Sequence, residues 1–171
     1  MEAKRLIAAE WFNYAQQDFT SAQYLAEMPT SPMENICFLC QQAAEKALKG
    51  YLILNDVSKP PLTHDLGWLS KMCVEKDPNF EQIEESSINL TPYGVRARYP
   101  FQIDITRKDM FRALKDADKV IGFVLDRVKG KRQGYRIKPQ KKTLARSKSD
   151  FLSAERTTSG DRKIEKYVPQ L

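Results

Sequence analysis

Long apolar runs, cysteine and histidine are all scarce in this chain of 171 residues. No stretch approaches the roughly 18 consecutive apolar residues of a membrane-spanning helix, so we expect no membrane partner. The first residues turn amphipathic at once and lack the apolar core of a signal peptide, which predicts a cytoplasmic protein. The three cysteines are an odd, small set. They predict reduced thiols and argue against a disulfide framework.

The motifs of several enzyme classes are also missing. No glycine-rich phosphate loop of the P-loop or dinucleotide type occurs. Cys37 and Cys40 form a C-x-x-C pair, which with Cys73 and His64 could be imagined as a zinc site. The pair lies in mid-helix within an apolar stripe, where cysteine behaves as a small hydrophobe. We therefore expect neither a metal nor a cofactor, and nothing marks a catalytic nucleophile beside His64.

The positive charge is unevenly distributed. The chain as a whole carries a net charge of +6. Residues 1–128 hold 15 Lys and Arg against 18 Asp and Glu, a net charge of −3, whereas residues 129–171 hold 13 against 4, a net charge of +9. The last segment also has few large apolar residues to offset chain entropy. We predict a folded domain over residues 1–130 and a basic, disordered tail over 131–171, either solvated or attracted to nucleic acid.

Apolar residues recur at steps of three and four through most of the first 128 residues. No segment shows the period of two that a half-buried strand needs. The pattern predicts an all-α fold, an up-and-down bundle of four to five antiparallel helices with a basic C-terminal extension. Segment 91–105 is expected to be irregular, and the expected helices are 3–28, 31–55, 63–76, 80–90 and 106–128.

Two helix starts carry recognisable signals. Ser31 is a candidate cap, Pro32 suits a first helical position, and Glu34 stands where a capping box needs an acid. Thr106 is a candidate cap for the last helix, with Asp109 favourably placed in its first turn. We expect both helices to begin at these positions.

The second helix carries two neighbouring rows of polar residues. Gln41, Glu45 and Lys49 are spaced by four, and so are Gln42 and Lys46, so each row lies on one face. One interpretation is a solvated face with a Glu45–Lys49 ion pair. The other is a polar groove between helices that receives a phosphate or a base. The residues alone leave both open.

A distant turn gathers arginine and tyrosine. Arg96 and Arg98 lie two apart, with Tyr93 before them and Tyr99 after them. Arginine binds phosphate in bidentate fashion and tyrosine offers a stacking face, which favours an anion site. The alternative is structural, with the arginines at helix ends and the tyrosines in the core. The single histidine, His64, is expected to cap or pack at a helix start.

Taken together, these segments resemble the HEPN family, a domain of higher eukaryotes and prokaryotes with suspected nucleotide binding. The likeness covers about residues 5–128, in order and with compatible spacing. It rests on Trp11, Ala15, Asp18 and Ala22, then Cys40-Gln-Gln-Ala-Ala-Glu-Lys-Ala-Leu-Lys-Gly-Tyr-Leu52, His64-Asp-Leu66 with Leu69, Tyr93 with Arg96-Ala-Arg-Tyr-Pro100, and Ala117-Asp-Lys-Val120.

The resemblance implies a helical bundle, usually dimeric, with a cleft lined by the second helix and the Arg-Tyr-Pro segment. Some members are nucleotide-binding companions of minimal nucleotidyltransferases. Others are metal-independent ribonucleases, often toxins, in which a histidine follows an arginine by four to six residues. Here the only histidine precedes Arg96, which disfavours ribonuclease activity.

The resulting hypothesis is a module that binds a nucleotide or RNA phosphate. It would act as a homodimer in a toxin–antitoxin or nucleotidyltransferase-associated system, with a minimal nucleotidyltransferase as the partner. The alternatives are a divergent metal-independent ribonuclease toxin and a non-catalytic dimerisation or interaction module. The predicted ligand-binding residues are Arg96, Arg98, Tyr99, Tyr93, Gln42, Glu45, Lys46 and Lys49.

Overall fold

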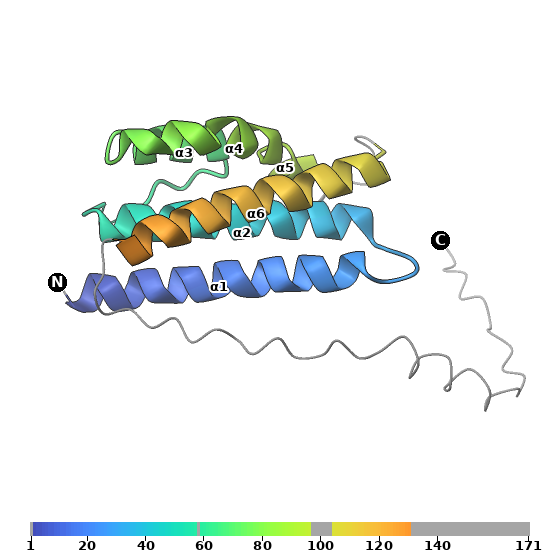
Figure 1. The fold of residues 1–171 in the computed structure, drawn as a ribbon, viewed down its shortest axis with the longest axis horizontal. Helices are drawn as coiled ribbons and strands as arrows, with labels where there is room; N and C mark the ends of the chain where they lie inside the picture. The colour runs from blue at the N-terminus through green and yellow to red at the C-terminus, as the bar shows by residue number, and fades with distance from the viewer. Residues whose placement is uncertain (1, 58, 97–103, 131–171) are drawn as a thin grey trace, which may run out of the picture. The chain divides into compact units, whose positions relative to one another are not determined.

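The computed structural model describes residues 2–57, 59–96 and 104–130. All regular elements in these ranges are helical, which confirms the all-α prediction (Figure 1). The predicted tail, residues 131–171, lies outside them, so its boundary stays a prediction. The elements are α1 (Glu2–Ala26), α2 (Met33–Leu54), α3 (Leu66–Val74), the 3₁₀ helix η1 (Pro78–Ile83), α4 (Glu84–Leu90), α5 (Tyr93–Arg96) and α6 (Arg107–Gly130).

Helix α2 occupies the centre of the bundle. It contacts α1 on one side, α6 along its length, and α3, α4 and α5 on the remaining sides (Figure 1). Apolar residues at steps of three and four along α2 form a buried stripe of Ile36, Cys40, Ala43, Ala47 and Tyr51. Burial nevertheless extends far beyond one stripe, because neighbours cover α2 on nearly every side.

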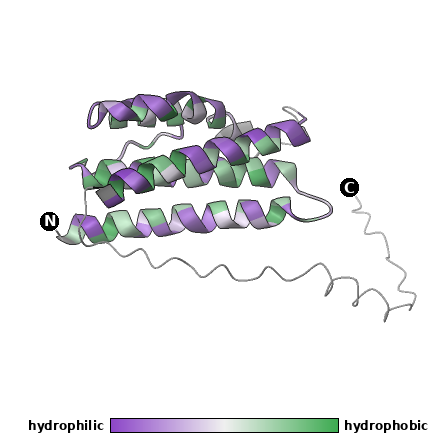
Figure 2. Ribbon diagram, viewed as in Figure 1, coloured by the Kyte–Doolittle hydropathy of each residue, from purple (hydrophilic) through white to green (hydrophobic). Residues whose placement is uncertain are grey.

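The other two long helices bury one side each. Figure 2 shows hydrophobic and hydrophilic residues alternating along α1 and α6, as expected of amphipathic helices. The predicted helical spacing of apolar residues is confirmed in both helices, with Trp11, Leu25 and Leu114 only partly buried. The fully or almost fully buried members are Ala8, Phe12, Ala15, Phe19 and Ala22 in α1, and Met110, Ala117, Ile121, Val124 and Val128 in α6.

Gly50 marks a close approach of α1 to α2. A Cβ atom at this position would lie 2.7 Å from Cε1 of Phe12, a ring that is itself buried. Glycine costs about 1 kcal/mol against alanine within a helix. The absence of a side chain at Gly50 lets the Phe12 ring pack directly on the α2 backbone.

Several helix boundaries differ from the sequence predictions. Ser31 does not cap α2: its hydroxyl donates to the carbonyls of Met28 and Ala26, at 3.0 and 3.2 Å. It therefore satisfies acceptors at the end of α1, which helix geometry leaves without partners. Pro32 is the N-cap residue of α2 instead of its first residue, and no side chain caps this helix.

The predicted cap of the last helix is confirmed. The backbone N–H of Thr106 donates to Oδ2 of Asp109 at 3.0 Å, and the N–H of Asp109 donates to Oγ1 of Thr106 at 3.3 Å. This reciprocal pair is a capping box with aspartate as its acid. It fixes the point at which α6 begins.

Two shorter segments also depart from prediction. The expected helix 80–90 is divided into η1 and α4, and the expected irregular segment 91–105 begins with the helical turn α5. Helix α3 starts at Leu66, later than the predicted Thr63. Its cap is Asp65, whose side chain accepts the Trp68 N–H at 3.0 Å.

The connection after α2 determines the position of the polar residues. It turns back beside α2, so that α3 begins next to the middle of that helix (Figure 1). The side-chain amide of Gln41 donates to the backbone carbonyl of His64 at 3.3 Å. Residues far apart in the sequence are thereby brought onto the polar side of α2.

Candidate functional site

The row Gln41, Glu45 and Lys49 is buried. Their exposed fractions are 0%, 6% and 6%, which excludes the solvated-face interpretation for this row. Burying charge is costly unless each group is paired and hydrogen-bonded. The site therefore depends on how the buried carboxylate of Glu45 is satisfied.

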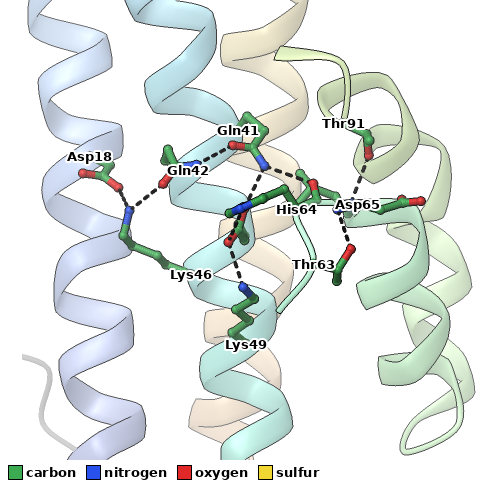
Figure 3. Close-up of polar contacts among 11 residues, drawn as sticks. Asp18, Gln41, Gln42, Lys46, Lys49, Thr63, His64, Asp65 and Thr91 are labelled. Atoms are coloured by element: carbon green, nitrogen blue, oxygen red, sulfur yellow. Dashed lines mark hydrogen bonds and ion pairs between the residues drawn. The ribbon is translucent and has the colours of Figure 1, made fainter. Parts of the chain in front are cut away.

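Three side chains surround the Glu45 carboxylate. Lys49 Nζ donates to Oε1 at 2.8 Å, and Gln41 Nε2 donates to Oε2 at 2.9 Å. His64 Nδ1 lies 3.0 Å from Oε2 and 3.2 Å from Oε1. Both carboxylate oxygens are thus engaged by a cation, an amide and an imidazole. Figure 3 shows the three partners, Lys49, Gln41 and His64, lying together at α2.

These contacts determine the charge of Glu45. Burial alone would raise the pKa of this carboxyl group, since it disfavours the ionised form. Hydrogen bonds from Lys49, His64 and Gln41 outweigh burial and hold its pKa below the ordinary value. Glu45 is therefore ionised at neutral pH.

The second row links this centre to α1. Gln42 Nε2 donates to Gln41 Oε1 at 2.8 Å, and Lys46 Nζ donates to Gln42 Oε1 at 3.3 Å. Lys46 also pairs with Asp18 of α1, with its Nζ 2.5 Å from Oδ2. A continuous chain of side-chain contacts thus runs from α1 across α2 to His64 (Figure 3).

Helix α5 lies against this chain. A Cβ atom at Gly94 would be 3.0 Å from Cδ and 3.1 Å from Nε2 of Gln41. The turn that leads into the arginine segment is thus packed on the polar side of α2, which α5 contacts. A larger residue at position 94 would require the Gln41 amide to shift by a few tenths of an ångström.

The structure brings some predicted site residues together and leaves others undescribed. Gln42, Glu45, Lys46 and Lys49 share the network described above. Tyr93 begins α5 and is partly buried, and burial raises its pKa to about 12. Arg96 is the last residue of α5, whereas Arg98 and Tyr99 lie outside the described residues.

Sequence reasoning missed the role of His64. It does not cap α3, since Asp65 does, and its imidazole instead contacts a carboxylate 19 positions earlier. No local spacing links residues so far apart. The available signal was that the single histidine follows an extended loop long enough to return to α2.

The three cysteines are packing residues. Cys37, Cys40 and Cys73 are free and buried, and burial raises the pKa of each thiol. Cys73 Sγ lies 3.9 Å from the Leu48 carbonyl. Within the described ranges, no group of three or more His, Cys, Asp or Glu is arranged to hold a metal ion.

In residues 2–57, 59–96 and 104–130, every helix is too short or too polar to cross a bilayer. The helices instead bury their apolar sides against one another.

Comparison with known proteins identifies one family and two similar structures. The HEPN domain model matches residues 8–129. TT1696 from Thermus thermophilus has a similar structure, with 27% identity and a TM-score of 0.60, covering 70% of this chain and 96% of that one. ST0689, described as an archaeal HEPN homologue, is 23% identical with a TM-score of 0.54, covering 71% and 97%. No curated protein matches this chain.

Proposed function

Because the chain belongs to the HEPN family, we propose that it binds a nucleotide or an RNA phosphate between α2 and the segment 93–100. One observation carries the proposal. Gly94 packs against the Gln41 amide, so helix α5, which leads into the Arg-Ala-Arg-Tyr-Pro segment, contacts the polar side of α2. A polar network next to a segment with two arginines is suited to an anionic, hydrogen-bonding ligand.

The ion pairs of the network indicate which cations are available to a ligand. Lys46 is paired with Asp18 and Lys49 with Glu45, so each of their charges is already matched. The proposal therefore assigns phosphate binding to Arg96 and Arg98, with Lys46 and Lys49 as supporting charges. Gln42 and Tyr99 would contact the base or ribose, and Tyr93 would line the site.

Thermal shift measurements test this assignment. We expect ATP, GTP or a short RNA to stabilise the wild-type protein, by about 2.7 kcal/mol at one hundred times the dissociation constant. The Arg96→Ala/Arg98→Ala variant should lose this shift. Lys115→Ala/Lys119→Ala removes the same charge from exposed positions of α6 and should keep it. A wild-type protein that responds to none of these ligands would contradict the proposal.

The assembly forms part of the same proposal. We infer a homodimer that acts beside a minimal nucleotidyltransferase or in a toxin–antitoxin pair. Light scattering after size-exclusion chromatography tests the first point, since a dimer of the 19.7 kDa chain doubles the mass. Co-purification with a neighbouring nucleotidyltransferase tests the second, and a monomer that copurifies with nothing would argue against both.

A metal-independent ribonuclease is the second candidate. The observation in its favour is an exposed imidazole held by a buried carboxylate, an arrangement common in general bases. Incubation with RNA in a chelator tests it. Cleavage that disappears in both Arg96→Ala and His64→Ala would support the enzyme, and intact RNA with the wild-type protein would exclude it.

A further inference from the structure

Helices α3 and α4 carry two large apolar side chains on their solvent side. The two helices pack against each other (Figure 1). Trp68 of α3 is 50% exposed, and Ile88 of α4 is 51% exposed. A Cβ atom at Gly67 would lie 3.0 Å from Cγ1 of Ile88, so Ile88 rests on the α3 backbone directly beside the Trp68 position. The two side chains therefore occupy neighbouring positions across the helix pair.

Contacts between the two helices fix how they are aligned. The backbone N–H of Leu66 donates to Oγ1 of Thr91 at 3.0 Å, so the start of α3 lies beside the end of α4. At the other end, Lys71 Nζ lies 3.9 Å from Oε1 of Glu84. The helices thus run antiparallel. Lys71 is the single cation of α3 and α4, and its charge is matched by Glu84.

Acidic side chains flank the apolar pair. Asp65 caps α3 beside Trp68, whose N–H its Oδ1 accepts at 3.0 Å. On α4, Glu85 stands three residues before Ile88 and so shares its side of the helix, and Glu81 precedes it in η1. All three acids are exposed, and none forms an ion pair with a described residue. We call Asp65, Trp68, Glu81, Glu85 and Ile88 the α3–α4 face.

The negative charge of the bundle is concentrated in this part of the chain. Residues 65–90 hold 2 Lys against 6 Asp and Glu, a net charge of −4, whereas residues 1–128 as a whole carry −3. The rest of the bundle is therefore almost neutral. A surface of one charge sign attracts the opposite sign and repels its own. The α3–α4 face is thus unsuited to a nucleic acid or a phosphate and suited to a cationic partner.

The combination of an exposed indole with carboxylates selects among cations. A guanidinium group stacks on an aromatic face and pairs with a carboxylate at the same time, which an ammonium group does less well. Tryptophan is also enriched among the residues that contribute most to protein interfaces. Ile88 offers an apolar contact next to this cation position. A protein segment that carries arginine and a nearby apolar residue matches all of these features.

We propose that the α3–α4 face binds an arginine-rich segment of a partner protein. One guanidinium stacks on Trp68 and pairs with Asp65, an apolar residue of the segment packs on Ile88, and further arginines pair with Glu81 and Glu85. The proposal goes beyond the proposed function, because it needs neither a nucleotide nor the arginines of segment 93–100.

Fluorescence anisotropy with a labelled synthetic peptide tests the proposal. The probe is a short peptide that repeats Gly-Arg-Leu-Arg, added to the full-length protein at low salt. The control peptide has every arginine replaced by citrulline, which keeps the shape of the side chain and removes its charge. We expect the arginine peptide to bind about 10-fold more tightly than the control. Equal binding of the two peptides, or binding of neither, would overturn the proposal.

An aromatic variant with a matched control locates the contact. Trp68→Ala should weaken binding of the arginine peptide about 5- to 30-fold, the usual effect of truncating a central interface residue. Phe111→Ala removes an aromatic side chain of similar exposure, 57%, from α6 and should leave binding unchanged. A thermal melt checks that both variants fold. Unchanged binding in a folded Trp68→Ala variant would contradict the assignment.

A charge variant provides a second measurement that leaves the apolar contacts intact. Glu81→Gln/Glu85→Gln should weaken binding about 2- to 10-fold. Glu10→Gln/Glu27→Gln removes the same charge from exposed positions of the first 27 residues and should have no effect. An equal loss in the two variants would show that the peptide responds only to net charge, and the proposed face would then be wrong.

Two further measurements distinguish other occupants of the face. Light scattering after size-exclusion chromatography compares the masses of wild type and Trp68→Ala. A lower mass in the variant would identify the face as a contact between copies of this chain and would overturn the partner assignment. Peptide binding that appears only after truncation at Gly130 would assign the face to residues 131–171 and would overturn it equally. Unchanged mass, with binding in the full-length protein, supports the proposal.

Discussion

At the residue scale, Glu45 is the main determinant of the polar site. It is a buried carboxylate with partners from a lysine, an amide and an imidazole, two of them on its own helix. Removing one partner of such a buried pair typically costs about 3–5 kcal/mol, because the other charge is left unmatched. The more exposed Lys46–Asp18 pair contributes at most about 1 kcal/mol.

The ionisation of Glu45 makes stability depend on pH. Its pKa is lower in the folded protein than the ordinary value of 4.5, so the folded state favours the ionised form. Its contribution is fully present above about pH 4.5 and is lost as the pH falls through the folded-state pKa. We expect the wild-type free energy of unfolding to decline below about pH 4.5 and to decline less steeply in Glu45→Gln. Urea unfolding at a series of pH values measures this, and parallel profiles for the two proteins would contradict it.

The buried thiols give a second prediction at this scale. Burial raises the pKa of Cys37 to about 12 and raises the pKa values of Cys40 and Cys73 as well, so thiolate is scarce at pH 8. A thiol-reactive disulfide reagent should react slowly with the native protein and quickly with all three thiols in denaturant. Rapid reaction of the native protein would show that the core opens at α2.

At the scale of elements, two glycines within helices should respond in opposite ways to alanine. Gly122 of α6 is exposed, and apart from its chain neighbours and its own helix backbone no described atom lies within 4 Å of an added Cβ. Gly122→Ala should therefore stabilise the protein by about 1 kcal/mol. At Gly50 the added methyl group would meet the Phe12 ring, and overpacking costs typically about 1–3 kcal/mol. That cost offsets or exceeds the gain in helix propensity, so we expect Gly50→Ala to be the less stable variant. Chemical denaturation of both variants checks the order, and the reverse order would show that Phe12 can move.

The element scale also shows what the sequence could predict. The stripe through Phe12 and the four-residue spacing of Gln41, Glu45 and Lys49 correctly placed the helices and the polar row, because helical periodicity is local. The burial of that row was not predictable, since the groups that cover it come from His64 and Gly94. Helix α5 was missed because four residues are too few to show a period.

At the scale of the whole molecule, the charge is unevenly distributed along the chain. Residues 129–171 carry a net charge of +9 against −3 for the rest. Truncation after Gly130 should leave the melting temperature of the bundle nearly unchanged, because the core lies within residues 8–128. The same truncation should weaken RNA binding and reduce its dependence on salt, since fewer counterions are released.

Fluorescence anisotropy with labelled RNA at several salt concentrations checks this prediction. The matched control is the full-length Arg96→Ala/Arg98→Ala variant, which keeps the tail and loses the proposed site. Unchanged affinity in the truncated protein would identify the tail as a solvated extension. A large drop in melting temperature would show instead that the tail supports the fold.

Three successive side-chain hydrogen bonds on α2 run in one direction, and this has a consequence. Lys46 donates to Gln42, Gln42 donates to Gln41, and Gln41 donates to Glu45. Each amide is oriented by its neighbours, so reversing one requires reversing the other, and such aligned bonds strengthen one another. Lys46 also pairs with Asp18 of α1, so this chain of contacts joins the outer helix to the buried carboxylate of Glu45.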